Sequence, residues 1–118
     1  APGTWEAGVR SYWDLEANFV PPPHGTGPGG SYSRVWSALA RVPYLSGGNT
    51  FISYDDAESV AAKAAYARAH ALGGLMWWEA SDDRNGVLLA AANEAFAAGA
   101  VLAPSSAPSP SPSSSPAS

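Results

Sequence analysis

Cysteine is absent from this chain of 118 residues, so disulfides give no indication of the compartment in which the protein works. Basic residues are also scarce, because only six lysines and arginines are scattered along a chain of net charge −4. This charge balance disfavours binding to nucleic acid or to an anionic membrane surface. No apolar run approaches the roughly twenty residues that a membrane-spanning helix needs. The sequence therefore predicts no nucleic-acid partner and no membrane partner.

Residues that bind metals or cofactors are few. His24 lies in the loop-like stretch "PPPHGTGPGG", and His70 lies near the expected end of a helix. Neither has a second ligand at the spacing of a metal site. The G-x-S-x-G motif and the P-loop do not occur, and "GTGPGG" at residues 25–30, which has the spacing G-x-G-x-x-G, is interpreted as a flexible turn. We therefore predict no metal site and no cofactor.

The two ends of the chain have distinctive compositions. The opening "APGTWEAGVR" has no initiator methionine and no signal-peptide features, so we expect either a processed N-terminus or a piece of a longer polypeptide. Residues 104–118 contain only proline, serine and alanine, which favours an extended, disordered linker or stalk. Such tails are often O-glycosylated, which favours an extracellular, secreted protein. An ordinary unstructured tail is the alternative.

Aromatic residues, by contrast, are plentiful. They make up 11% of the chain, with five Trp and five Tyr. This is too many for a disordered polymer and enough to build a core or to line a cleft. The first hundred residues or so are therefore expected to form one small domain or part of a larger one.

Strand and helix signals alternate from residue 50 onward. "TFISY" (50–54) and "LMWW" (75–78) have the composition of strands. A helix is predicted between them at residues 54–74, with Asp55 as its cap and Glu58 completing a capping box. A second helix is predicted at residues 86–98. Apolar residues repeat at helical spacing in both: Val60, Ala64, Ala67 and Ala71, then Leu88, Leu89, Ala92 and Phe96. The alternation indicates an α/β architecture with a parallel sheet.

The N-terminal half has a different, α+β pattern. Residues 4–19, "TWEAGVRSYWDLEANF", are compatible with a helix, and residues 21–30 form an expected loop. Residues 31–45, "SYSRVWSALARVPYL", predict one or two short strands with Pro43 near an edge.

The stretch "GGLMWWEASDD" at residues 73–83 places two tryptophans beside several acids. Ligands of parallel α/β folds lie at the carboxyl ends of the strands, where Trp78, Glu79, Ser81, Asp82 and Asp83 are expected. An indole face stacks on the C–H groups of a sugar ring, and carboxylates accept hydrogen bonds from its hydroxyls. Core packing of the tryptophans and helix capping by Asp82 and Asp83 are the alternative. Capping is also the favoured role of the Asp55 and Asp56 pair.

Residues 51–85, "FISYDDAESVAAKAAYARAHALGGLMWWEASDDRN", resemble the closing segment of family 18 glycoside hydrolases, the chitinases. That family typically shows "F-x-S-Y-D-D-x-x-S-x-x-x-K-x-x-Y" followed by "G-L-G-G-x-M-x-W-E". The pieces "PGTWEAGVRSYWDL" and "YSRVWSALARVPYL" are similar to the small insertion that bacterial-type chitinases carry late in the barrel. The resemblance covers about residues 2–98.

The resemblance implies an α/β fold that is the C-terminal part of a (β/α)8 TIM barrel, preceded by a small α+β insertion. It divides the chain into an insertion at residues 1–54, the last helix–strand–helix segment of the barrel at 55–103, and the Pro/Ser linker at 104–118. Residues 74–79 would be the eighth barrel strand. Residues 50–54 would then be the last strand of the insertion rather than a barrel strand.

The implied function is that of a chitinase fragment, acting on chitin or chitooligosaccharides by the substrate-assisted retaining mechanism. The family's catalytic glutamate belongs to a D-x-x-D-x-D-x-E motif, which does not occur here. The chain alone is therefore predicted to be inactive and to contribute no catalytic residue. Its expected partner is the missing N-terminal part of its own barrel.

The implied substrate-binding residues follow the same resemblance. Trp78 matches the tryptophan that floors the subsite of the cleaved sugar, next to Glu79, whereas Trp77 is expected to pack. The insertion forms one wall of the substrate groove, and its candidate lining residues are Trp5, Glu6, Tyr32 and Trp36. Ser37 and Ala38 stand where relatives commonly carry acidic or amide residues, so other wall contacts are not carried over.

Two other functions remain open at this point. A non-catalytic, lectin-like relative would bind chitin through the same groove and would lack the glutamate of the missing motif. A cell-wall structural protein with a Ser/Pro stalk would have no complete barrel upstream.

Overall fold

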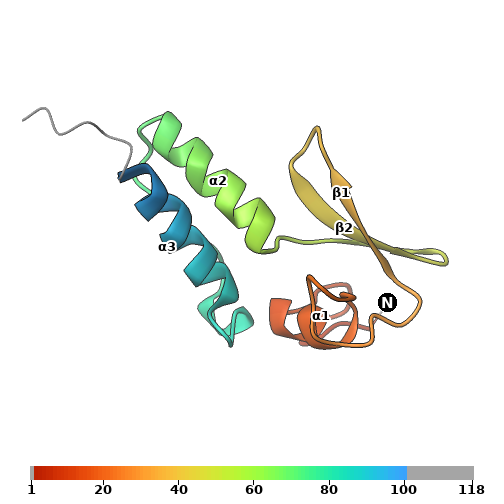
Figure 1. Ribbon diagram of the computed structural model, residues 1–118. Coiled ribbons are helices and arrows are strands. Elements are labelled where there is room, and N and C mark those ends of the chain that lie inside the picture. Colours follow the sequence, from red (N-terminus) through yellow and green to blue (C-terminus); the bar gives the residue numbers. More distant parts are fainter. Residues whose placement is uncertain (1, 101–118) are drawn as a thin grey trace, which may run out of the picture.

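The computed structural model describes residues 2–100, so the predicted linker at 104–118 and residues 101–103 lie outside the described residues (Figure 1). The elements, in chain order, are α1 Tyr12–Asn18, β1 Ser33–Ser37, β2 Val42–Gly47, β3 Thr50–Ser53, α2 Ala57–Ala69, the 3-10 helix η1 Ala80–Asp82 and α3 Val87–Ala100. Figure 1 shows α2 and α3 side by side, with the sheet and α1 beyond the N-terminal end of α2.

The three strands form one antiparallel sheet of order β1-β2-β3. The strands predicted within residues 31–45 and 50–54 are thus confirmed. Pro43 pairs with Trp36 of β1, but the pairing of β2 with β3 begins only at Tyr44. Pro43 therefore has a neighbouring strand on one side alone, as expected for a residue that lacks a backbone N–H.

Helix α1 is much shorter than the helix compatible with residues 4–19. Residues 4–9 instead form a turn, in which the N–H of Thr4 donates to the carbonyl of Val9 at 2.9 Å. Gly8 within this turn has φ +84°, a left-handed conformation that does not fit a right-handed helix. The helical pattern is therefore realised only after Ser11.

Helix α2 begins at a different aspartate from the one predicted. Its N-cap is Asp56, whose Oδ1 accepts a hydrogen bond from the N–H of Ser59 at 3.0 Å. Ser59, not Glu58, completes the capping box, because its hydroxyl accepts from the N–H of Asp56 at 2.9 Å. Of the four predicted inward positions, Val60, Ala64 and Ala67 are buried. Ala71 is exposed because the helix ends at Ala69.

The predicted parallel sheet is absent from residues 2–100, and residues 75–78 belong to no strand there. A strand exists only as part of a hydrogen-bonded ladder, and no described strand pairs with this segment. The composition of "LMWW" indicates a buried strand but does not supply the neighbours that a strand needs. Leu75 instead packs against a buried cluster between the helices.

Helix α3 begins one residue later and ends two residues later than predicted. Leu88 and Ala92 are buried against α2, as the periodicity indicated, and Phe96 is half-buried. Leu89, predicted in the same apolar repeat, is half-exposed and does not share the buried face of Leu88 and Ala92.

Two buried clusters form the core of residues 2–100. The first joins Tyr12, Val60, Leu88 and Ala92 between α1 and the helical pair. The second joins Leu15, Val20 and Leu45 between α1 and the sheet. The side chain of Tyr54, which lies between β3 and α2, packs against both clusters.

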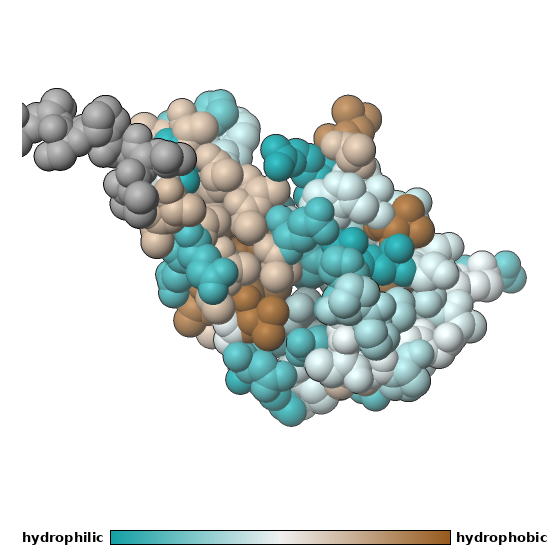
Figure 2. All heavy atoms as spheres, viewed as in Figure 1, coloured by the Kyte–Doolittle hydropathy of each residue, from teal (hydrophilic) through white to brown (hydrophobic). Residues whose placement is uncertain are grey.

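The two halves differ in surface character. Figure 2 shows an apolar face over α2 and α3, whereas the face over the sheet and α1 is mostly polar. Much of the apolar face is alanine, which is frequent in both helices. Among the described residues, no helix has the length and apolarity needed to cross a bilayer.

Candidate functional site

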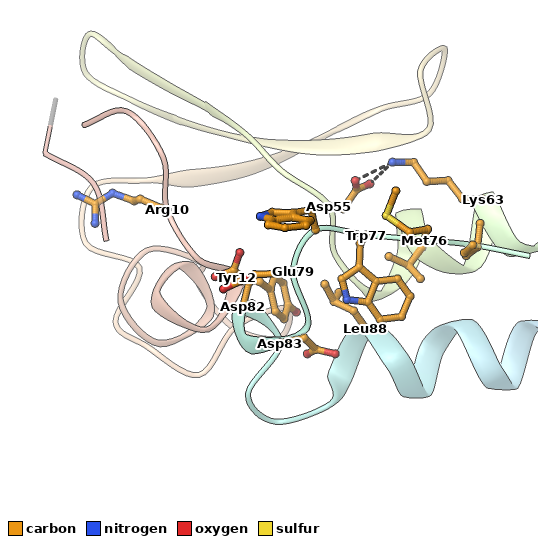
Figure 3. A pocket seen from close by; sticks show the side chains of 13 residues that line it. Arg10, Tyr12, Asp55, Lys63, Met76, Trp77, Glu79, Asp82, Asp83 and Leu88 are labelled. Carbon is orange, nitrogen blue, oxygen red and sulfur yellow. Dashed lines mark hydrogen bonds and ion pairs between the residues drawn. The ribbon is translucent and has the colours of Figure 1, made fainter. Parts of the chain in front are cut away.

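A cavity of about 240 Å³ lies beside residues 75–79 (Figure 3). Its lining comes from several elements: α1 supplies Tyr12, α2 supplies Val60 and Lys63, and α3 supplies Leu88. The loop segment supplies the remaining apolar and acidic side chains, which are Leu75, Met76, Trp77, Trp78, Glu79, Asp82 and Asp83. Arg10 and Asp55 complete the lining. The cavity therefore combines aromatic faces with ionisable groups.

The two adjacent tryptophans have different environments. The side chain of Trp78 is 89% exposed, and that of Trp77 is half-buried. The peptide bond between Trp78 and Glu79 is cis. An indole that is open to solvent at the mouth of a cavity can stack on an apolar ring face, and this is the interaction that a sugar offers.

The carboxylates around the cavity are held in different ways. Glu79 is exposed and accepts a hydrogen bond from the hydroxyl of Ser81. Asp55 forms two hydrogen bonds of 2.7 Å with the ammonium of Lys63, and this pair is drawn with dashed lines in Figure 3. Asp83 is only 8% exposed, and its Oδ2 accepts from the backbone N–H of Leu89 at 3.0 Å.

The other oxygen of Asp83, Oδ1, is buried and has no hydrogen-bond partner among the described residues. Asp83 thus caps the start of α3, which was one of the two roles expected for it. Asp82, the other expected cap, makes no side-chain hydrogen bond within residues 2–100, and its side chain lines the cavity.

Tyr12 is a cavity residue that sequence reasoning did not single out. Burial raises the pKa of its hydroxyl above the usual range, and the charges of Glu16 and Asp56 raise it further. Tyr12 therefore stays a neutral hydroxyl that can donate or accept a hydrogen bond. Its only signal in the sequence was its place in "PGTWEAGVRSYWDL", since its contact with α2 and α3 depends on tertiary packing.

The structure brings two of the six predicted substrate-binding residues, Trp78 and Glu79, to this cavity. The other four do not line it. Trp5 is 73% exposed, and its indole N–H donates to the hydroxyl of Ser11 at 3.0 Å. Glu6 is exposed and pairs with Val9 in an isolated β-bridge.

Tyr32 and Trp36 lie on the sheet side of the molecule. The ring of Tyr32 packs edge-on against Phe19 at 5.4 Å, and it lines a second, open hollow of about 640 Å³ beside β3. Trp36 lies on β1, with the guanidinium of Arg34 5.4 Å from its ring centre. In the described residues, these four side chains are therefore separate from the Trp78 cavity.

One group of potential metal ligands was not visible in the sequence. Atoms of His24, Asp56 and Glu58 lie within 4.8 Å of one another. The guanidinium of Arg34 already bonds both carboxylates at 2.7 Å. A cation would have to displace or approach this positive group, so the cluster is better described as an ion-pair network.

Comparison with known proteins identifies relatives of this chain. A family model described as "Glycosyl hydrolases family 18" matches residues 2–83. Chitinase A1 of Niallia circulans is 49% identical over 88 residues, which is 73% of this chain but only 12% of that protein. The chain thus spans a small part of this curated relative.

Solved structures give the same picture. A glycoside hydrolase family 18 N-acetylglucosaminidase from Paenibacillus barengoltzii superimposes with a TM-score of 0.61 and 36% identity, over 70% of this chain and 22% of that one. Chitinase ChiA74 from Bacillus thuringiensis superimposes with a TM-score of 0.60 and 39% identity, over 70% of this chain and 13% of that one.

Proposed function

This chain belongs to glycosyl hydrolase family 18, and from that premise we propose that it supplies substrate-binding residues to a secreted chitinase. The substrate would be a polymer of β-1,4-linked N-acetylglucosamine. The single observation that carries this proposal on the chain itself is the exposed indole of Trp78 at the mouth of a cavity that also holds several carboxylates. Such a combination suits a ring with apolar faces and hydroxyl rims.

Within this proposal, Trp78 forms the floor on which one sugar ring stacks, and Glu79 accepts hydrogen bonds from its hydroxyls. Trp5, Glu6, Tyr32 and Trp36 would line a wall farther along the groove. Their separation from the Trp78 cavity is consistent with a polymeric substrate, because a chain of several sugars extends well beyond one stacking platform. The orientation of Trp5 is supported by its hydrogen bond to Ser11.

We also propose a place for the chain in a larger fold. Residues 1–54 would form the insertion, residues 55–103 the last helix–strand–helix segment of a (β/α)8 barrel, and residues 104–118 a linker. The α+β character of the first part and the packed pair of α2 and α3 support this division. Residues 75–78 would gain their missing strand neighbours from the rest of the barrel.

The reaction follows from the family rather than from groups in this chain. In the substrate-assisted mechanism a glutamic acid protonates the glycosidic oxygen, and the acetamido group of the substrate is the nucleophile. The 118 residues contain no D-x-x-D-x-D-x-E motif that would supply that acid. The role of this chain would be to bind and orient the sugar, and we expect no hydrolysis by the chain alone.

A lectin-like protein is the second candidate, because every candidate residue in this chain is of the binding type. The full-length gene product distinguishes the two. Release of reducing ends from chitooligosaccharides supports the chitinase. Retention on chitin beads without release supports the lectin. A folded protein that neither releases reducing ends nor is retained on the beads would contradict both candidates.

A further inference from the structure

The carboxylate of Asp56 joins the sheet to α2, the helix that precedes the Trp78 segment (residues 75–79). The Nε and Nη2 atoms of Arg34 on β1 both donate to Oδ2 of Asp56, at 2.9 and 2.7 Å. The other oxygen of Asp56 accepts from the N–H of Ser59 and caps α2. The same side chain therefore starts the helix and anchors the strand.

This contact is well shielded from water. The side chains of Arg34 and Asp56 are only 9% and 5% exposed. Nη2 of Arg34 also bonds Glu58 at 2.7 Å, but Glu58 is half-exposed and its pair is screened. Two donors of one planar guanidinium on the same buried carboxylate oxygen restrict orientation as well as distance.

Both ends of the contact lead to candidate substrate-binding residues. On the sheet side, Trp36 lies two residues after Arg34 and therefore on the same face of β1, with its ring 5.4 Å from the guanidinium. On the helix side, Val60 lies one turn after the Asp56 cap and belongs to the cluster against which Leu75 packs. Leu75 is three residues before Trp78.

We propose that Arg34 is a positioning residue that, through Asp56, sets the placement of the sheet and its Trp36 relative to the Trp78 segment. The inference rests on the proposed function for its consequence, namely that a long sugar chain contacts both places and a short one contacts only the Trp78 cavity. Arg34 itself touches no substrate in this scheme. Loss of Arg34 should therefore weaken the binding of long sugar chains more than the binding of short ones.

The test uses the full-length gene product with Arg34→Lys, which keeps the charge but loses the planar two-donor contact, and Arg34→Met, which loses both. Glu58→Gln and Arg41→Lys are matched controls, because the first removes only the exposed pair and the second changes an exposed arginine. We expect the Arg34 variants to raise KM for chitohexaose about tenfold, as expected for a misplaced binding surface. KM for a chromogenic chitobioside and both kcat values should change less than about twofold, and the controls should behave as wild type.

A uniform loss for both substrates, or no loss for either, overturns the positioning role. A second measurement does not depend on sugar. Amide hydrogen exchange should quicken at residues 33–37 and 75–79 in Arg34→Met but not in Glu58→Gln. Unchanged exchange at residues 75–79 in Arg34→Met overturns the inference, whether or not the wild type acts on chitooligosaccharides. Inactivity of the wild type would instead contradict the proposed function.

Discussion

The carboxylate of Asp83 accepts a hydrogen bond from the backbone N–H of Leu89 and so ties the loop after Trp78 to the first turn of α3. The loop is also held by its own backbone, since the N–H of Gly86 donates to the carbonyl of Asp83 at 3.0 Å. The site segment between Leu75 and Asp83 is therefore anchored at both of its ends.

Replacing Asp83 by Ala should lower the free energy of unfolding by about 1 kcal/mol, because a free N–H at the start of α3 loses its acceptor. Chemical denaturation measures this loss. Asp82→Ala is the matched control and should change stability by less than about 0.5 kcal/mol, since Asp82 makes no side-chain hydrogen bond within residues 2–100. Equal losses in both variants would show that the Asp83 contact is not the cause.

Replacing Trp78 by Ala should weaken sugar binding in the full-length protein by about 1 to 3 kcal/mol, the contribution of a stacking platform. Stability should hardly change, because the side chain is 89% exposed. Calorimetric titration with chitooligosaccharides measures the binding. Tyr66→Ala, another exposed aromatic residue, is the control and should bind as wild type. Unchanged affinity in Trp78→Ala would contradict the subsite role.

The leucines of the sheet provide a matched pair for the core. Leu45 in the central strand is fully buried, whereas Leu39 in the β1–β2 turn is 98% exposed. Leu45→Ala should reduce the free energy of unfolding by about 2 to 5 kcal/mol through lost burial and a residual cavity. Leu39→Ala should reduce it by less than about 0.5 kcal/mol. Chemical denaturation measures both losses, and losses of similar size in the two variants would contradict this placement of the core.

Two glycines should respond in opposite ways to Ala. A Cβ on Gly27 would collide with the backbone carbonyl of Ala17, which cannot move without disturbing α1. Gly27→Ala should therefore destabilise the fold by more than about 2 kcal/mol. A Cβ on Gly73 meets nothing within 4 Å, so Gly73→Ala should be neutral or stabilise by up to about 1 kcal/mol. Thermal unfolding of the two variants checks the order.

Alkaline pH should weaken the fold through Tyr54. Burial, followed by the charge of Asp56, raises the pKa of Tyr54 from 10.0 to about 12. The folded state therefore holds this proton more tightly than the unfolded state, so the stabilisation is complete below pH 10 and is lost as the pH rises towards 12. Denaturation at several pH values measures the slope. Tyr54→Phe should flatten it, and an unchanged slope in this variant would exclude Tyr54 as the source.

Local signals in the sequence were sufficient for the hairpin strands and for the existence of α2 and α3. Each of these elements is defined by residue type and spacing over a few residues, such as the aromatic and β-branched "TFIS" of β3. The cap of α2 could not be chosen in this way, because Asp55 and Asp56 are adjacent and equally able to cap. The guanidinium of Arg34, 22 residues earlier, bonds Asp56.

The same distinction applies to the site. Trp78 and Glu79, which line the cavity, were predicted as substrate-binding residues because they are neighbours in the sequence and match a family motif, and that role stays a prediction. Tyr12 and Lys63 reach the same cavity from α1 and α2, and only tertiary packing brings them there. Residues 75–78 are the opposite case: their composition is that of a strand, but within residues 2–100 no strand pairs with them and no ladder forms.

The aromatic ring of Tyr54 is shared by the two buried clusters, one between the helices and one beneath the sheet. A side chain common to both clusters couples their unfolding, because neither cluster can lose its packing without exposing the ring of Tyr54. The sheet part and the helical part of this chain should therefore melt in a single cooperative step. Variants that keep only Trp36 or only Trp77 of the five tryptophans would then report the same midpoint by fluorescence.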